Sequence, residues 1–189
     1  MSKPPIKLAL CGKLRSGKSL VAGYLSLMHD FQPFAFGDAL KNAFHRAFPQ
    51  IPRQPKPRAY YQSFGQWART TIDENVWVDA TMRKVDEYLS QKHCDCNGRL
   101  RVLIEDVRQQ NEYDRLKREG FVFVRITAPD ELRLERARKV GDDFTEADLE
   151  HETETFVDSF EVDYEVLNDG TVDELCAKVD MVIRQLTEK

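Results

Sequence analysis

Apolar and polar positions along the chain follow two spacings. Short apolar runs, typical of strands buried on both faces, alternate with longer segments in which apolar residues recur every three or four positions, as in amphipathic helices. The runs predict strands at residues 6–11, 31–36, 102–105, 121–127 and 164–167. The helical spacing predicts helices at about 18–28, 39–48, 60–69, 76–90, a segment ending near 120, 130–139, 146–156 and 172–186.

Strands that alternate with helices predict βαβ units, and therefore a parallel sheet covered by helices on both faces. With 189 residues, the chain is long enough for one such α/β domain, which we expect to span residues 1–189. Residues 49–57 contain four of the eight prolines and predict an irregular connection between two helices.

Composition narrows the class of protein. Hydrophobic residues make up 41% of the chain and charged residues 32%, as in globular proteins, and the net charge of -4 argues against a dedicated nucleic-acid binder. No apolar run approaches the roughly 20 residues that span a bilayer, and no signal-peptide core is present. The four cysteines do not resemble a disulfide framework. We therefore expect a cytoplasmic protein without nucleic-acid or membrane partners.

A phosphate-binding motif follows the first predicted strand. Residues 12–19 read Gly-Lys-Leu-Arg-Ser-Gly-Lys-Ser, which matches G-x-x-x-x-G-K-[ST] between a strand and a helix. Backbone N–H groups of such a loop and the helix N-terminus attract phosphate, the lysine bridges the β and γ phosphates, and the final serine binds Mg²⁺. The motif predicts an ATP·Mg²⁺ site formed by Gly12, Lys13, Ser16, Gly17, Lys18, Ser19 and Leu20.

Several arginines point to phosphoryl transfer rather than to a GTPase or a transporter ATPase, whose Asn-Lys-x-Asp and LSGGQ motifs are absent. Arg15 lies in the loop, Arg108 follows the third strand, and Arg133 and Arg136 share a helix face. Arginine suits phosphate oxygens, although exposed arginines or surface ion pairs are the alternative at each position.

An acidic pair ends the third predicted strand. Asp106 is the candidate for holding Mg²⁺ through water, with Glu105 as its competitor, because ligands bind at the carboxyl ends of parallel strands. His93, Cys94 and Cys96 lie close together, but they are too few for a structural zinc site, and a reduced loop is the simpler interpretation.

A family resemblance rests on several short motifs across residues 7–177. The chain resembles the phage and bacterial deoxynucleoside monophosphate kinases in residues 12–18, in Phe36-Gly37-Asp38-Ala39-Leu40-Lys41, in Gln62-x-x-Gly65-x-x-x-Arg69 with Trp77, and in Asp106-Val107-Arg108 with Asn111-Glu112. It is more distantly similar to animal-type phosphomevalonate kinase, through the phosphate loop, the Asp-x-Arg sequence and the spacing of Arg133 and Arg136. Ser19 departs from the first family, which often has aspartate there.

This resemblance implies a P-loop NTPase fold with a five-stranded sheet, a helical acceptor-binding subdomain at about 39–92 and a lid at about 130–150. Asp38 and Lys41 would lie between donor and acceptor, and Arg69 would join Arg108 on the acceptor phosphate. The turn 168–170, Asn168-Asp169-Gly170, would contact adenine through backbone groups. The implied catalytic set is Lys18, Arg15, Asp38, Arg133 and Arg136.

The expected reaction is transfer of the γ-phosphoryl group of ATP, with Mg²⁺, to a (deoxy)nucleoside monophosphate by a monomer or homodimer. Aromatic residues cluster before Arg69, and Trp67 is the candidate to stack on a nucleobase, whereas most of the others are expected in the core. Two alternatives stay open: phosphomevalonate or another small acceptor, and an ATP-binding switch without fast transfer.

Overall fold

The computed structural model describes residues 4–91, 99–139 and 152–188. These residues form two compact units. Unit 1 contains the described residues up to 33 and from 99 onward, and unit 2 contains residues 34–91. Unit 1 is therefore built from two separate stretches of sequence.

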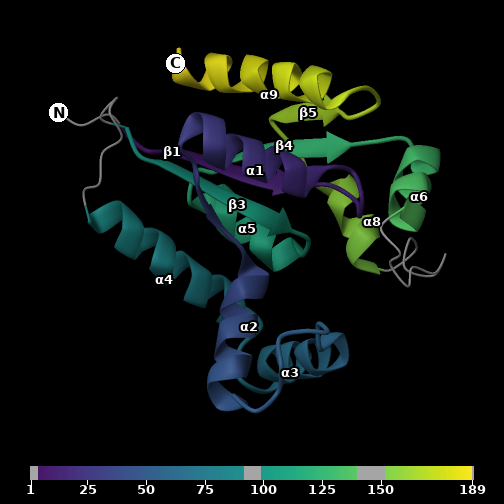
Figure 1. The fold of residues 1–189 in the computed structure, drawn as a ribbon. Helices are drawn as coiled ribbons and strands as arrows, with labels where there is room; N and C mark the ends of the chain where they lie inside the picture. Colours follow the sequence, from purple (N-terminus) through teal and green to yellow (C-terminus); the bar gives the residue numbers. More distant parts are fainter. Residues whose placement is uncertain (1–3, 92–98, 140–151, 189) are drawn as a thin grey trace. The chain divides into compact units, whose positions relative to one another are not determined.

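A five-stranded parallel sheet forms the centre of unit 1 and confirms the predicted fold class (Figure 1). The strand order is β2-β3-β1-β4-β5, in which β1 pairs in parallel with β3 and β4, and β4 with β5. Its strands are β1 (Ile6–Cys11), β2 (Gln32–Phe34), β3 (Arg101–Val107), β4 (Val122–Thr127) and β5 (Tyr164–Leu167), and the last residue of β2 falls in unit 2. Because β1 is central, the loop after it leaves the middle of the sheet's carboxyl edge.

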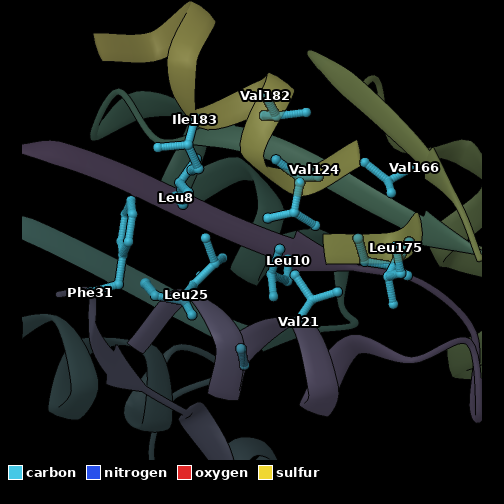
Figure 2. Packing of buried hydrophobic residues seen from close by; sticks show 14 of the residues in the cluster. Leu8, Leu10, Val21, Leu25, Phe31, Val124, Val166, Leu175, Val182 and Ile183 are labelled. Carbon is cyan, nitrogen blue, oxygen red and sulfur yellow. The ribbon is translucent and has the colours of Figure 1, made fainter. Parts of the chain in front are cut away.

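Helices cover both faces of this sheet: α1 (Lys18–His29) and α9 (Val172–Thr187) lie on one face and α5 (Gln110–Arg118) on the other. Helices α6 (Asp130–Lys139) and α8 (Glu152–Ser159) lie near the carboxyl end of β4. On one face, Val21 of α1 and Leu175 of α9 pack with Leu10 and Val124 of the strands (Figure 2). On the other face, Phe123 contacts Tyr113 of α5 with 4.6 Å between ring centroids. The adjacent residues 123 and 124 thus face opposite layers, which explains the continuous apolar runs seen in the sequence.

Unit 2 consists of α2 (Phe36–Ala47), α3 (Arg58–Thr71) and α4 (Val76–Ser90). Their shared core contains Phe44, Tyr61 and Trp77. Two buried hydrogen bonds accompany this packing: Trp77 Nε1 donates to Gly65 O at 3.2 Å, and His45 Nε2 lies 2.6 Å from the hydroxyl of Tyr61. The proline-rich segment that joins α2 to α3 contains neither helix nor strand, as predicted.

Element boundaries differ from prediction at several helix and strand ends, chiefly in the strands β2 and β3. The apolar run 31–36 yields only a short β2, because Phe36 already begins α2. Asp38 lies in the first turn of α2, where its carboxylate interacts favourably with the helix dipole. Strand β3 extends to Val107 through a bulge, since Ala9 pairs with Ile104 but Cys11 pairs with Val107. Residues 140–151 lie outside the described part of the chain. They include part of the helix predicted at 146–156 and part of the lid predicted at 130–150.

Candidate functional site

The phosphate loop lies between β1 and α1 and depends on two glycines. Gly12 has a φ of 145° and Gly17 a φ of 110°, values that favour glycine. A Cβ atom would lie 2.3 Å from Ile126 O at the first position and 2.3 Å from Asn168 Nδ2 at the second. Neither position therefore accepts a side chain without displacing its surroundings.

Two polar side chains lie inside this loop. Lys18 is 9% exposed, and its Nζ donates to Gly12 O and, at 2.8 Å, to Lys13 O. Ser16 is 1% exposed, and its Oγ has no hydrogen-bond partner within residues 4–91, 99–139 and 152–188. A buried cation beside an unsatisfied hydroxyl in a glycine cradle fits an anionic ligand such as a phosphate group. Ser19 and Leu20, in the first turn of α1, are exposed.

Side chains from two other parts of the chain hydrogen-bond to the backbone of the loop. The carbonyl groups of residues 14–16 each accept a hydrogen bond from one of these side chains. Arg133 Nε donates to the first at 2.8 Å, Arg136 Nη1 to the second at 3.5 Å, and Asn168 Nδ2 to the third at 2.8 Å. Arg136 Nη2 also lies 3.3 Å from both oxygen atoms of Asn168. All three residues therefore lie beside the loop, and their predicted roles stay predictions.

A cleft of about 110 Å³ opens beside the loop. Its walls come from the loop, the end of β4, the start of α6 and the end of α8. Two of its residues were missed from the sequence: Arg125, whose Nη2 donates to Val157 O at 3.1 Å, and Asp158, which pairs with Lys13 Nζ at 2.7 Å. Arg125 left a signal, since it is the one charged residue in an apolar strand, but Asp158 left none.

A thiol lies next to this cleft at the end of β1. Burial raises the pKa of Cys11 to about 11, although the positive charges of Arg125 and Lys18 partly oppose this. The thiol is therefore protonated at neutral pH and is a poor nucleophile.

The candidate metal ligands and the candidate acceptor residue Arg108 lie at the end of β3, near its bulge. Glu105 and Asp106 are both half-buried in β3. The turn that follows is fixed by Glu112, which is 5% exposed and accepts hydrogen bonds from the backbone N–H of Arg108 at 2.7 Å and of Gln109 at 3.0 Å. The strand end and the start of α5 therefore form a rigid junction.

Unit 2 carries the other predicted acceptor residues. Asp38 Oδ1 accepts a hydrogen bond from Lys41 Nζ at 2.7 Å, so these two charges form an ion pair. Trp67 is 52% exposed and stacks on Phe64, with ring planes 28° apart, while Arg69 is half-buried on the same helix. The stacked, exposed indole is available to a planar ligand.

The turn after β5 is well ordered by local contacts. Asn168 is 6% exposed, and its backbone N–H donates to Thr127 O at 2.7 Å. A hydrogen bond from Lys178 lowers the pKa of Asp169. Thr171 then caps α9 in a reciprocal pair of hydrogen bonds with Glu174. The predicted contact of residues 168–170 with adenine stays a prediction.

Two further expectations concern a metal site and membrane-spanning segments. His93, Cys94 and Cys96 lie outside the described residues. Within the described part of the chain, no group of three or more His, Cys, Asp or Glu side chains is arranged to hold a metal ion. No helix among the same residues has the length and apolar character needed to cross a membrane.

The sheet order and the loop geometry define a P-loop kinase-like α/β fold. The AAA domain family (AAA_18) matches residues 8–157, and the chain belongs to this family. No curated protein matches the chain significantly.

Solved structures extend the fold assignment over nearly the whole chain. TT1252 from Thermus thermophilus is 20% identical, with a TM-score of 0.62 over 97% of this chain and 99% of that protein. An unliganded sugar kinase from Janibacter sp. is 16% identical (TM-score 0.54; 96% and 95% covered), and shikimate kinase from Aquifex aeolicus is 18% identical (TM-score 0.55; 96% and 98% covered). At these identities the likeness concerns the fold, and the acceptor must be argued from the residues.

Proposed function

We propose that the chain is an ATP-dependent phosphotransferase whose acceptor is a (deoxy)nucleoside monophosphate, yielding the diphosphate and ADP. The donor half of this proposal, in which ATP is the phosphoryl donor, rests on the phosphate loop. There Lys18 Nζ and the unsatisfied Ser16 Oγ are buried inside a glycine cradle beside an open cleft. This supports binding of a polyphosphate, because a buried ammonium group and a hydroxyl both find partners in phosphate oxygens.

The proposed chemistry is a direct in-line transfer. The bond between the γ-phosphorus and its bridging oxygen breaks as an acceptor phosphate oxygen bonds to the same phosphorus, and the electron pair leaves with ADP. Lys18 and Arg15 would offset negative charge on the transferring group, and the backbone of residues 168–170 would contact the base. Ser19 and Asp106 are the proposed holders of Mg²⁺, which neutralises phosphate charge when bound.

The acceptor half rests on unit 2. Trp67 offers an exposed indole face, and Arg69 lies two residues further along the same helix, half-buried. An indole can stack on a base and a guanidinium can bind phosphate, so each residue by itself suits a nucleotide, although residues two apart in a helix do not share a face. We also propose Asp38, Lys41 and Arg108 as acceptor contacts.

The test is ADP release measured over a panel of acceptors with ATP and Mg²⁺ held constant. The panel contains the common ribo- and deoxyribonucleoside monophosphates, phosphomevalonate, shikimate and simple sugars. We expect turnover with at least one nucleotide and its loss in Lys18→Ala. If every nucleotide is inert while another compound is turned over, the acceptor class is wrong but the transferase assignment stands.

An independent readout is intrinsic fluorescence. The chain has two tryptophans, and Trp77 is 6% exposed whereas Trp67 is 52% exposed. A nucleotide acceptor that stacks on Trp67 should quench the emission of wild type but not of Trp67→Phe. Equal quenching in both proteins would remove Trp67 from the acceptor site.

A second candidate is transfer to a hydroxyl group, since the similar folds include a sugar kinase and a shikimate kinase. The same acceptor panel decides between the two. A third candidate, an ATP-binding switch, predicts tight nucleotide binding with no turnover on any acceptor.

A further inference from the structure

We infer that Arg133 is a positioning residue for the phosphate loop, holding it in its phosphate-binding shape through a loop carbonyl rather than contacting the transferring group. The inference deepens the proposed function and rests on its donor half. Its starting point is the conformation of Arg15, which has a φ of 61° although it is not glycine. Left-handed backbone at such a residue is disfavoured, so neighbouring contacts must hold it.

Those contacts come from α6. The carbonyl just before the left-handed residue, Leu14 O, accepts a hydrogen bond from Arg133 Nε at 2.8 Å. The carbonyl of Arg15 itself accepts a longer one, at 3.5 Å, from Arg136 Nη1. Both peptide groups that flank the strained residue are thereby fixed. Of the two arginines, Arg133 makes the shorter bond and is the one we assign.

Burial and charge agree with this role. Arg133 is 3% exposed, and its Nη1 pairs with Asp130 Oδ1 at 2.6 Å, whereas the side chain of Asp130 is 75% exposed. The planar guanidinium thus joins the start of α6 to the loop through two donors in a fixed geometry. A left-handed residue next to right-handed ones turns successive N–H groups toward one concave side, which is the arrangement that binds anions. Holding the carbonyl of Leu14 therefore keeps the peptide group before Arg15 in the orientation that the left-handed conformation needs.

If Arg133 acts in this way, the effect of removing it on nucleotide affinity depends on which residue stands at position 15. A direct contact between Arg133 and phosphate would not produce this dependence. Without Arg133, the left-handed conformation at Arg15 loses its main support, and the expected loss of nucleotide affinity is about 5- to 30-fold. Glycine adopts this conformation freely. With glycine at position 15, the loop no longer needs Arg133, and removing it should cost about 2-fold or less.

The experiment is a double-mutant cycle on Mg·ADP affinity, measured by titration calorimetry with wild type, Arg133→Met, Arg15→Gly and the double variant. ADP is the probe because it lacks the γ-phosphoryl group on which the Arg15 charge is proposed to act. Arg138→Met is the matched control, since Arg138 is exposed on the same helix, and its affinity should stay within 2-fold of wild type.

Folding is checked by thermal unfolding of each variant. Removing Arg133 leaves Asp130 in contact with water, so no charge is buried without its partner. Should Arg133→Met still fail to fold, Arg133→Lys replaces it in the cycle. That variant keeps the charge beside Asp130 but loses the planar fork, and it should also bind ADP more weakly than wild type.

The outcomes separate cleanly. A large loss in Arg133→Met that nearly disappears in the Arg15→Gly background supports the inference. Equal losses in both backgrounds mean that Arg133 contacts the nucleotide directly and overturn it, as does unchanged affinity in the folded Arg133 variant. If wild type itself does not bind Mg·ADP, the proposed function fails, which is a different result from either of these.

Discussion

The contact between Gly17 and Asn168 gives the sharpest prediction for the phosphate loop, namely the effect of Gly17→Ala. An alanine at this position meets two penalties. Its φ of 110° is a strained conformation for a residue with a Cβ atom, at a cost of about 1–3 kcal/mol. Its Cβ would lie 2.3 Å from Asn168 Nδ2, so the amide must move.

The second penalty follows from what that amide does. Asn168 Nδ2 donates to Ser16 O at 2.8 Å in a buried position, and leaving a buried carbonyl unsatisfied costs about 1–3 kcal/mol. The sum is about 2–6 kcal/mol, a large share of the 5–15 kcal/mol by which domains are stable. For a chain of this size the melting temperature should fall by roughly 4–24 °C.

Scanning calorimetry or far-UV circular dichroism is the suitable assay. Both tryptophans, Trp67 and Trp77, lie in unit 2, so their fluorescence reports on the wrong unit. Gly23→Ala is the matched control, because a Cβ there has no atom within 4 Å. That change should raise stability by about 0.5–1 kcal/mol.

Two results would refute this reasoning. One is a Gly17→Ala protein that melts within about 1 °C of wild type. The other is a full penalty in an Asn168→Ala background, where the clash is gone and only the backbone strain of about 1–3 kcal/mol should persist.

Three other predictions concern single side chains. Lys18→Ala should lower turnover by about 10²–10³-fold or more, as expected for one preorganised charge, and near-normal turnover would exclude the proposed phosphate chemistry. Thr171→Ala removes the cap of α9 and should cost about 0.5–2 kcal/mol in urea unfolding, so an unchanged midpoint would contradict the capping assignment. Hydrogen bonds from Thr171 lower the pKa of Glu174, so its stabilisation should be complete above about pH 5 and fade as the pH falls through the lowered pKa. The stability difference between wild type and Glu174→Gln should therefore shrink on acidification, and a constant difference would argue against it.

Local signals explain which parts of the fold could be predicted. The phosphate loop was located because its residues are contiguous, and β1 was bounded correctly because a strand buried on both faces leaves a continuous apolar run. The same signal overextended β2: Phe31 and Phe36 are each 2% exposed, but the first lies before the strand and the second in α2. An apolar residue reports burial, and burial does not distinguish a strand from a helix end.

Contacts between distant residues explain what could not be predicted. The hydrogen bond from Arg133 to Leu14 O joins residues 119 apart in sequence, and the pairing of Lys13 with Asp158 depends equally on tertiary placement. The spacing of Arg133 and Arg136 gave their shared helix face, but not that they contact loop carbonyls. The bulge in β3 also leaves no pattern, because one extra residue in a strand only becomes visible when its partner is known.

The pairing of β1 with β3 has a consequence for how the chain is made. Ile6 pairs with Arg101, so the central strand leaves the ribosome about 95 residues before its neighbour exists. At translation rates of 5–20 residues per second, that interval lasts about 5–20 s. The three helices of unit 2 are synthesised during this interval and can form from local contacts, while the apolar strand ahead of them waits unpaired. A slow stretch of codons in that region would prolong the exposure of β1, and chaperone capture of the nascent chain should peak there.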